Sequence, residues 1–361
     1  MYKRQDVGSK TMKNLTSEVG IIGAGTLGVS LAYHLRNFNI SCTVFDKELN
    51  VASHASGKNA GMMRQLYRHE QLTEWASKFI VEMPKSLKEK FFVQAGSVIL
   101  GRELPNHHQN LFEQITIKNN TTNKIPAIKC KTDGLLDSGP YVNALHSLAK
   151  RNGAEFKLAT KVLRINESNG AWNLETDKGN FKFELLVNAA GAWCSDLIDN
   201  KSSSELNLQA FARHLAIVKG FDKDFMPIEN CGYYWDELDS WYMRKWSDNS
   251  RLVSVCDQEP CHPEKYPQNK NIKEQISEIL VRKIPETAKK LSLGNFWHCY
   301  RTYTEDKLPI VGFDTSNNKL FWLAGFGGYG MSTSYSACLD AAKIIKGQNI
   351  TNAFSPNRLT N

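Results

Sequence analysis

The chain has 361 residues, 41% of them hydrophobic and 23% charged, and its formal net charge is +8. This length is ample for two domains, or for one domain with a large insertion, and the composition is that of an ordinary soluble protein. No run of about eighteen apolar residues occurs, which excludes a conventional membrane-spanning helix. The positive charge would suit an anionic substrate, a membrane surface or RNA, but it is spread along the chain and selects none of them.

The start of the chain, residues 1–17, is polar and basic, and we predict a flexible leader there. The apolar run that begins at Val19 is too short for a signal peptide and lacks a cleavage region. We therefore expect a cytoplasmic protein, and we leave peripheral association with the inner membrane open.

A glycine-rich turn follows the first apolar strand. Residues 18–22 read as a buried strand, the motif GAGTLG begins at Gly23, and residues 29–35 read as a helix. Gly23 permits the tight turn, Gly25 lets the backbone approach a pyrophosphate, and Gly28 lets helix and strand pack closely. The helix dipole and the first N–H groups face the anion. The pattern predicts a dinucleotide site on a parallel βαβ unit.

A second apolar run, residues 42–45, leads to Asp46, about twenty residues after the motif. A carboxylate at this position accepts the ribose hydroxyls of an adenosine. The small-residue segment from Ser53 to Met62 is suited to letting backbone amides run along an extended cofactor, although an ordinary loop is equally compatible with it. The first motif alone leaves NAD and FAD open.

Short apolar runs and helical stretches continue through the chain. We predict helices at residues 143–151 and 331–345, strands at residues 155–158, 161–165, 171–176, 181–188 and 320–324, further strand-like runs at residues 96–100, 214–218 and 252–255, and a polar loop at residues 258–271.

A second glycine-rich loop, GFGGYG at residues 325–330, comes directly before the last predicted helix. Four glycines at a helix entry aim a second positive helix end at bound negative charge. A flavin ring takes up negative charge as a hydride arrives, so this loop favours FAD over NAD. A glycine-rich entry needed only for close packing is the alternative.

The eight cysteines lie far apart and form no Cys-x-x-Cys pair, which argues against a zinc site and a disulfide framework and fits a reducing compartment. His107-His108 and Cys261-His262 could be read as metal ligands. Both pairs lie in polar segments beside prolines, so we predict no metal site.

With these two loops, the chain resembles the D-amino acid oxidase-like flavoproteins, which include glycine and sarcosine oxidases and bacterial D-amino acid dehydrogenases. The resemblance extends over nearly the whole chain. The segment LVNAAGAWC at residues 186–194 is similar to the family's second FAD-contacting strand and turn, and RTYTEDKLPIVG at residues 301–312 is similar to its carboxyl-terminal signature. Residues 189–194 and 327–333 look most like the D-arginine dehydrogenase branch.

This resemblance implies an α/β fold with a Rossmann-like FAD-binding domain and a second, α+β substrate domain built on a mostly antiparallel sheet. We expect the discontinuous FAD-binding domain at residues 18–84, 141–204 and 299–348, and the substrate domain at residues 85–140 and 205–298.

The resemblance also implies a set of FAD contacts. These are Gly23, Gly25, Thr26, Leu27, Gly28, Asp46, Lys47, Ser56, Asn59, Ala60, Gly61, Met62, Val162, Ala190, Gly191, Trp193, Cys299, Gly325, Gly327, Gly328, Tyr329, Gly330 and Met331.

Arg301 is the first candidate for substrate binding, because a guanidinium fork matches a carboxylate bidentately, and the resemblance places the carboxylate-binding arginine here. A surface salt-bridge arginine is the alternative. The resemblance puts Tyr242 at the substrate carboxylate and Tyr67 and Tyr329 in the active site, although core packing explains such aromatics equally well. Arg213 lies where relatives carry another basic residue.

Two departures from the D-arginine branch limit the substrate. Met62 stands where that branch has a histidine, and the acidic residue that selects a basic side chain is replaced around Gly96-Ser97. We therefore expect a neutral or small amine rather than D-arginine.

Cys299 raises the question of covalent FAD. In sarcosine oxidase-like members, a cysteine at the matching place forms a thioether to the flavin. A covalent link through Cys299 is thus an option, while non-covalent FAD beside a buried free cysteine is our expectation.

The resulting prediction is an FAD-dependent amino acid oxidase or dehydrogenase. It would oxidise the C–N bond of a small amino acid or N-substituted amino acid to an imine, by hydride transfer to flavin N5. The electron acceptor would be oxygen, a quinone or an electron-transfer partner. Family oxidases use a lysine near N5, for which Arg244-Lys245 are only loose candidates.

Three alternatives stay open at this point. They are an NAD(P)-dependent dehydrogenase, an FAD-dependent oxidase that modifies wobble uridines of tRNA, and a non-catalytic flavin-binding partner subunit. We expect no DNA binding, and both homo- and hetero-oligomers are compatible with the sequence.

Overall fold

The computed structural model describes residues 16–104, 111–118, 124–168, 170–197, 206–265, 267 and 269–359. Nearly all of the predicted leader, and the pair His107-His108, lie outside these residues.

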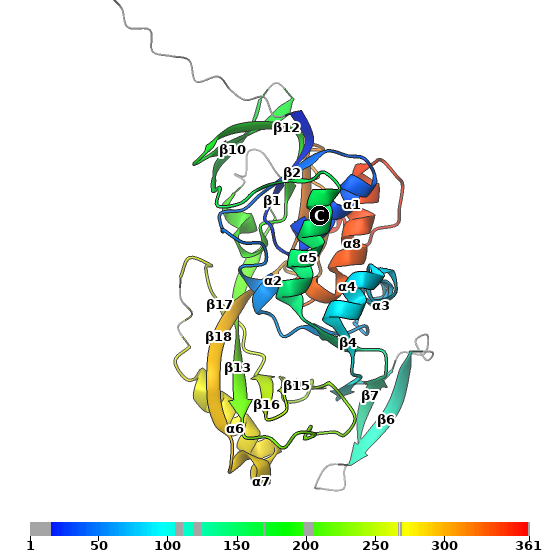
Figure 1. Ribbon diagram of the computed structural model, residues 1–361, viewed down its shortest axis with the longest axis vertical. Coiled ribbons are helices and arrows are strands. Elements are labelled where there is room, and N and C mark those ends of the chain that lie inside the picture. The colour runs from blue at the N-terminus through cyan, green and yellow to red at the C-terminus, as the bar shows by residue number, and fades with distance from the viewer. Residues whose placement is uncertain are drawn as a thin grey trace, which may run out of the picture.

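The first sheet has eight strands, and its centre is parallel (Figure 1). Five parallel strands lie in the order β20 (Leu320–Ala324), β12 (Gly179–Asn188), β1 (Thr16–Ile22), β2 (Cys42–Phe45) and β9 (Glu155–Lys157). Strands β10 (Val162–Ser168), β11 (Ala171–Thr176) and β19 (Ile310–Phe313) extend it in antiparallel pairing. The predicted strands of this region and the parallel βαβ start are confirmed.

Helices pack against one side of this sheet. They are α1 (Thr26–Asn37), α5 (Ser138–Arg151) and α8 (Gly330–Ile345), with α3 (Glu70–Glu82) against α8 (Figure 1). Their apolar faces share one core with the sheet. Strands β2 and β20 are fully buried, as expected of central parallel strands covered by other elements. None of the helices in the described part of the chain is long and apolar enough to cross a membrane.

His34 lies in the interface between α1 and α8 and provides a pH-dependent contribution to stability. It is 3% exposed, its Nε2 has no partner, and its ring centroid is 4.5 Å from that of Tyr335. Burial lowers the pKa of His34 from 6.5 to about 4. The native state therefore binds this proton more weakly than the unfolded chain, so stability is full above pH 6.5 and is lost as the pH falls towards 4.

We expect replacement of this histidine to flatten the acid side of the stability curve. Each pH unit within the window is worth about 1.4 kcal/mol, so the wild type should lose about 2 kcal/mol from this group between pH 6.5 and pH 5. His34→Leu should lack this loss. Urea unfolding of both proteins at pH 7 and pH 5 measures it, and equal losses in the two proteins would refute the assignment.

The second sheet has nine strands. Eight lie in the order β17 (Glu259–Pro260), β13 (Gln209–Lys219), β16 (Ser250–Ser254), β15 (Trp241–Ser247), β14 (Tyr233–Asp236), β5 (Ser97–Leu100), β7 (Lys124–Cys130) and β6 (Phe112–Lys118), and β18 (Ser292–Tyr303) pairs with β13. All pairs are antiparallel except β5 with β14, which confirms the mostly antiparallel sheet. The predicted loop at residues 258–271 was wrong in one detail, because it contains β17.

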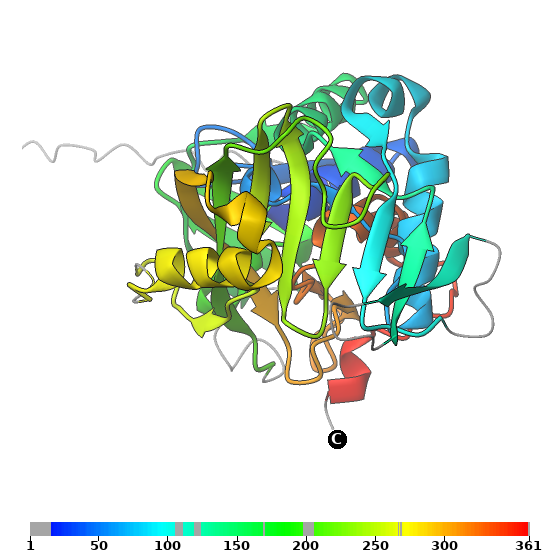
Figure 2. The ribbon, with the colours of Figure 1, turned by 90° about the horizontal axis from the view of Figure 1, so that it is seen from below.

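The two faces of this sheet have different partners. Helix α6 (Ile272–Lys283) crosses the outer face (Figure 2), and short α7 (Pro285–Ala288) follows it. The inner face carries Leu215, Tyr242 and Cys299, which pack against Ala60 and Met62. The segment that contains Ala60 and Met62 begins at α2 (Ala55–Lys58), which contacts both α5 and β18. The inner face therefore lies towards the glycine-rich end of the first sheet.

Smaller elements complete the fold. A three-stranded sheet has the order β3 (Met62–Met63), β8 (Gly134–Leu136) and β4 (Phe92–Gln94), preceded by α4 (Lys85–Phe91), and two 3-10 turns, η1 (Gly191–Asp196) and η2 (Pro356–Leu359), occur later. The predicted domain boundary at residue 299 falls inside β18, which belongs to the second sheet. The division into cofactor and substrate domains stays a prediction.

Candidate active site

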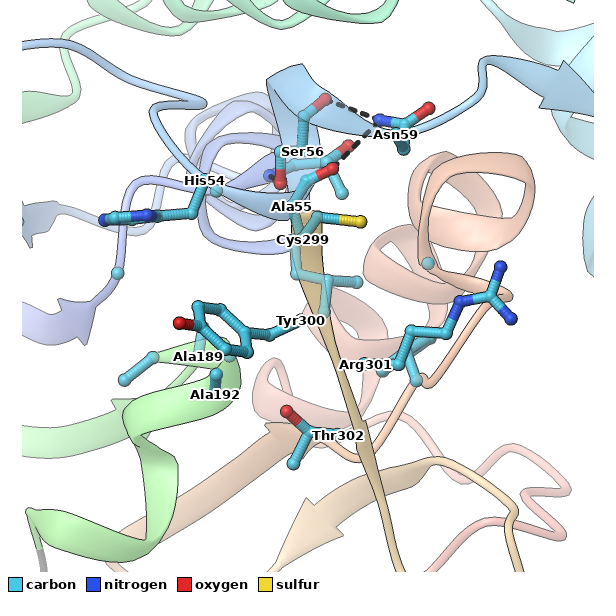
Figure 3. A pocket seen from close by; sticks show the side chains of 18 of the residues that line it. His54, Ala55, Ser56, Asn59, Ala189, Ala192, Cys299, Tyr300, Arg301 and Thr302 are labelled. Carbon is cyan, nitrogen blue, oxygen red and sulfur yellow. Dashed lines mark hydrogen bonds between the residues drawn. The ribbon is translucent and has the colours of Figure 1, made fainter. Parts of the chain in front are cut away.

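A cavity of about 670 Å³, the main cavity, extends from the start of α1 to β18 (Figure 3). Nearly all residues expected at the site line it: Gly23, Gly25, Thr26, Leu27, Asp46, Lys47, Ser56, Asn59, Ala60, Gly61, Met62, Tyr67, Val162, Ala190, Gly191, Trp193, Arg213, Tyr242, Cys299, Arg301, Gly325, Gly327, Gly328, Gly330 and Met331. Gly28 and Tyr329 do not. The loose candidates Arg244 and Lys245 do not line it either.

The first glycine turn has the geometry that its motif predicts. Gly23 has φ +107°, and a Cβ there would lie 2.4 Å from the carbonyl oxygen of Ala189. A Cβ on Gly28 would lie 1.9 Å from the carbonyl oxygen of Gly23. Gly28 therefore acts behind the cavity, where it lets α1 pack directly on the turn.

Asp46 organises the same turn. Its Oδ2 accepts a hydrogen bond from the backbone N–H of Ala24 at 2.7 Å, and its Oδ1 accepts one from Glu48 at 2.9 Å. A carboxylate accepts about four such bonds, so both oxygens retain acceptor capacity towards the cavity. Its predicted contact with a ribose stays a prediction.

The small-residue segment is held in place by its own side chains. Ser56 Oγ accepts a hydrogen bond from the Thr26 N–H at 2.9 Å, and Asn59 Nδ2 donates to the carbonyl oxygens of Ala55 and Ser56 (Figure 3). Asn59 Oδ1 accepts from the Gly61 N–H at 2.7 Å. These bonds fix the segment across the first turn of α1.

One end of the main cavity carries a small charged cluster that the sequence did not indicate. Glu264 Oε1 accepts from Lys47 Nζ at 2.7 Å and from Trp193 Nε1 at 2.6 Å, while Lys47 lies 4.1 Å above the Trp193 ring. The bonds from Lys47 and Trp193 lower the pKa of Glu264. Glu264 lies within the segment predicted as a plain loop, and no motif marks it.

The second glycine loop lies against β18. Gly327 has φ +47°, and a Cβ there would lie 2.1 Å from the Tyr303 ring; a Cβ on Gly328 would lie 3.1 Å from the guanidinium carbon of Arg301. Tyr329, which precedes α8, has its ring centroid 5.2 Å from that of Tyr67 in an edge-on arrangement. The loop thus brings the start of α8 close to Arg301.

Arg301 projects into the main cavity from β18. Alternation along the strand places Cys299 and Arg301 on one side and Tyr300 and Thr302 on the other (Figure 3). Gly328, which has no side chain, leaves the room that this guanidinium occupies.

Two buried tyrosines, Tyr242 and Tyr67, also line the main cavity. Tyr242 on β15 is 1% exposed, and burial raises its pKa to about 12, so it stays neutral and can donate a hydrogen bond at working pH. Tyr67 forms a short hydrogen bond with Ser332 on α8.

Sequence analysis missed two residues that line this part of the cavity, Arg64 and Trp235. Arg64 follows β3 with its guanidinium carbon 4.4 Å from the Tyr67 ring centroid and 4.6 Å from that of Trp235. Arg64 lies two residues after Met62, so strand alternation would have placed it beside the predicted cofactor segment.

Cys299 is buried, and burial raises the pKa of its thiol, against the opposing charges of Arg301 and Arg213. A thiol, unlike a thiolate, is a poor nucleophile. We expect FAD to bind non-covalently, so acid precipitation of the holoprotein should release all yellow colour into the supernatant. Colour that stays with the pellet of wild-type protein but not with that of Cys299→Ser would establish the thioether instead.

All eight cysteines, which lie among the described residues, are free thiols. In the described part of the chain, no three His, Cys, Asp or Glu side chains come together to hold a metal ion. His262, one of the two residues of the Cys261-His262 pair, forms an ion pair with Asp196, with 3.3 Å between Nε2 and Oδ2.

These features fit FAD. The glycine turn and the start of α1 provide a cradle for a pyrophosphate, which a Cβ at Gly23 or Gly25 would restrict. The cavity continues from there past the segment after α2 to the second glycine loop, which gives an extended path between two helix starts.

Comparison with known proteins supports the assignment of FAD to this cavity. The chain matches the family model described as FAD dependent oxidoreductase (DAO) over residues 18–343. It is 23% identical over 248 residues to monomeric sarcosine oxidase of Bacillus sp. (strain B-0618), with 59% of this chain and 60% of the oxidase covered. It is 23% identical over 355 residues to the mitochondrial pyruvate dehydrogenase phosphatase regulatory subunit of Mus musculus, with 88% and 40% covered. The chain spans less than two thirds of the length of these relatives.

Among solved structures, L-proline dehydrogenase from P. horikoshii has the same fold, with a TM-score of 0.81 and 21% identity over 95% of this chain and 97% of that one. This likeness shows the fold alone. The predicted likeness to the D-arginine dehydrogenase branch is not confirmed, whereas the expectation of FAD is. The chain belongs to the DAO family of FAD-dependent oxidoreductases, and FAD is its cofactor.

Proposed function

We propose that this chain oxidises the C–N bond of a small amino acid or N-substituted amino acid to an imine, which water then hydrolyses. The observation that carries the proposal is the placement of Arg301, a guanidinium in the main cavity beside the second glycine loop. A planar fork of N–H donors in that position binds a carboxylate bidentately and orients the adjoining carbon.

Bound FAD supplies the oxidising ring that accepts the hydride from the carbon beside the nitrogen. The chain's own residues bind and orient the substrate for that transfer. Arg301 holds the carboxylate, and the neutral hydroxyl of Tyr242 donates a further hydrogen bond to it. The start of α8, which the second glycine loop brings close to Arg301, would stabilise negative charge that develops on the cofactor during reduction. Trp235 and Tyr67 wall the cavity and exclude water from the reacting carbon.

Anaerobic titration tests the proposal directly. Holoprotein is mixed with D- and L-amino acids, glycine, sarcosine and other N-methyl amino acids, and the flavin absorbance near about 450 nm is followed. Bleaching by members of this panel supports the proposal, and a panel that leaves the spectrum unchanged refutes it.

A non-catalytic flavin-binding subunit is a second candidate, because a relative that matches 88% of this chain is named as a regulatory subunit. Turnover by the isolated chain would exclude it. The NAD(P)-dependent and tRNA-modifying alternatives gain no support from the family match. We further propose a cytoplasmic location, with oxygen, a quinone or an electron-transfer protein as acceptor.

A further inference from the structure

The part of the main cavity beside the second glycine loop carries three guanidiniums. We call Arg64, Arg213 and Arg301 the arginine cluster; all three line the cavity. Arg64 is 8% exposed and Arg213 is 2% exposed, and buried guanidinium nitrogens of both, Nε of Arg64 and Nε and Nη1 of Arg213, have no hydrogen-bond partner. Within the described part of the chain, none of the three forms an ion pair with a carboxylate.

The three groups surround one space. Arg301 lies beside the second glycine loop, where a Cβ on Gly328 would come within 3.1 Å of its guanidinium carbon, and Arg213 lies opposite Cys299 in the β13–β18 pair, two residues from Arg301 along β18. The charges of Arg301 and Arg213 both oppose the rise that burial causes in the pKa of Tyr242. The Trp235 ring contacts both the Arg64 guanidinium and the Tyr242 ring. It therefore links Arg64 to the side of the cavity that carries Tyr242.

Neighbouring carboxylates already have partners. Glu237 binds Arg102 through two bonds of 3.1 and 2.5 Å, and Asp257 accepts from His214 Nδ1 at 2.7 Å. Asp133 accepts from Ser97 at 2.6 Å, and it also accepts from Tyr233 and Gln65.

Charge balance differs along the cavity. The carboxylates that line the cavity are Asp46 at the glycine turn, Glu264 in the cluster around Lys47, and Asp196, which pairs with His262. Asp257 lowers the net charge around Arg213, since each influences the other electrostatically. Among the described residues, Arg64 forms no ion pair with a carboxylate, and Glu237, which acts on it electrostatically, is bound by Arg102.

Unbalanced charges with unused donors in a buried site are unfavourable unless a ligand satisfies them. An amino acid with one carboxylate would engage Arg301 and leave Arg64 without an anion. We propose that the substrate carries a second carboxylate and that Arg64 binds it. This rests on the proposed function and replaces the expected neutral or small amine with an acidic amino acid, of which aspartate, glutamate and iminodiacetate are the simplest examples.

Matched acids and amides test the idea on the wild-type holoprotein. Aspartate is compared with asparagine, glutamate with glutamine, and iminodiacetate with its monoamide, with both enantiomers of the chiral compounds. Each pair differs by one negative charge at nearly constant shape. We expect the best acid to exceed its amide by roughly 10- to 100-fold in kcat/KM, the range expected for a charge-assisted hydrogen bond. Amides that equal their acids would overturn the proposal.

A variant tests the assigned residue. Arg64→Met should reduce the preference for acid over amide to near unity while turnover of the amide persists. Arg68→Met is the matched control, because Arg68 lies four residues later, has an 86% exposed side chain and does not line the cavity. It should keep the wild-type preference. An unchanged preference in Arg64→Met would overturn the assignment.

Equilibrium binding separates this inference from the proposed function. Calorimetric titration of wild-type holoprotein with succinate and with its monoamide requires no turnover. Tighter binding of succinate, lost in Arg64→Met, supports the inference even if no amine bleaches the flavin, a result that would refute only the proposed function. Equal binding of the two ligands would overturn the inference, including when monocarboxylic amino acids are oxidised well.

Discussion

We expect Gly28→Ala to lower FAD affinity roughly 10- to 100-fold and to destabilise the chain. The added Cβ would lie 1.9 Å from the carbonyl oxygen of Gly23, which is backbone and cannot rotate away. Relief requires α1 to move off the turn, and the same movement takes its first N–H groups away from the pyrophosphate. Overpacking of this kind costs about 1 to 3 kcal/mol even where side chains adapt.

The measurement is the flavin content of the purified variant, together with its thermal unfolding temperature. Gly139→Ala is the control, because its added Cβ would meet nothing closer than the Gly57 Cα at 4.0 Å. It should retain wild-type flavin content. A fully loaded Gly28→Ala protein would contradict the packing described for this turn.

Arg301→Met should reduce kcat/KM for the preferred amino acid by roughly 30- to 5000-fold while FAD stays bound. Truncating one partner of a buried, hydrogen-bonded charge pair costs about 2 to 5 kcal/mol, and each 1.4 kcal/mol corresponds to about a factor of ten. Methionine retains most of the volume, so the loss reports the charge and the donors rather than a cavity.

Steady-state kinetics measure this effect, and the visible spectrum checks that flavin is retained. Arg164→Met, an exposed substitution on β10, should leave the kinetics unchanged. A holoprotein with methionine at position 301 and wild-type kcat/KM would refute Arg301 as the carboxylate-binding residue.

Helical and strand periodicity predicted many elements but not all. The spacing of Ile272, Ile276, Ile279 and Leu280 marks one face of a helix, yet α6 was not predicted, because polar neighbours and nearby loops masked it. Strands β3, β4 and β8 are two or three residues long, which is too short for an alternation of polar and apolar residues to be recognised in the sequence.

The sequence by itself predicted the phosphate cradle, because part of the glycine turn acts through local backbone geometry: Gly23 has φ +107°, and a Cβ on Gly28 would meet the carbonyl oxygen of Gly23, five positions earlier. Asp46 follows from the length of one βαβ unit. Only the tertiary structure showed that Arg64 joins the predicted Arg301 and Arg213 at one cavity. Arg64, Arg213 and Arg301 come from three distant segments, and only the pairing of β13 with β18, together with the packing of the segment after α2 on that sheet, brings their charges to one cavity. Whether a charge is balanced depends on which carboxylates lie within a few ångströms, and no spacing along the chain encodes that distance.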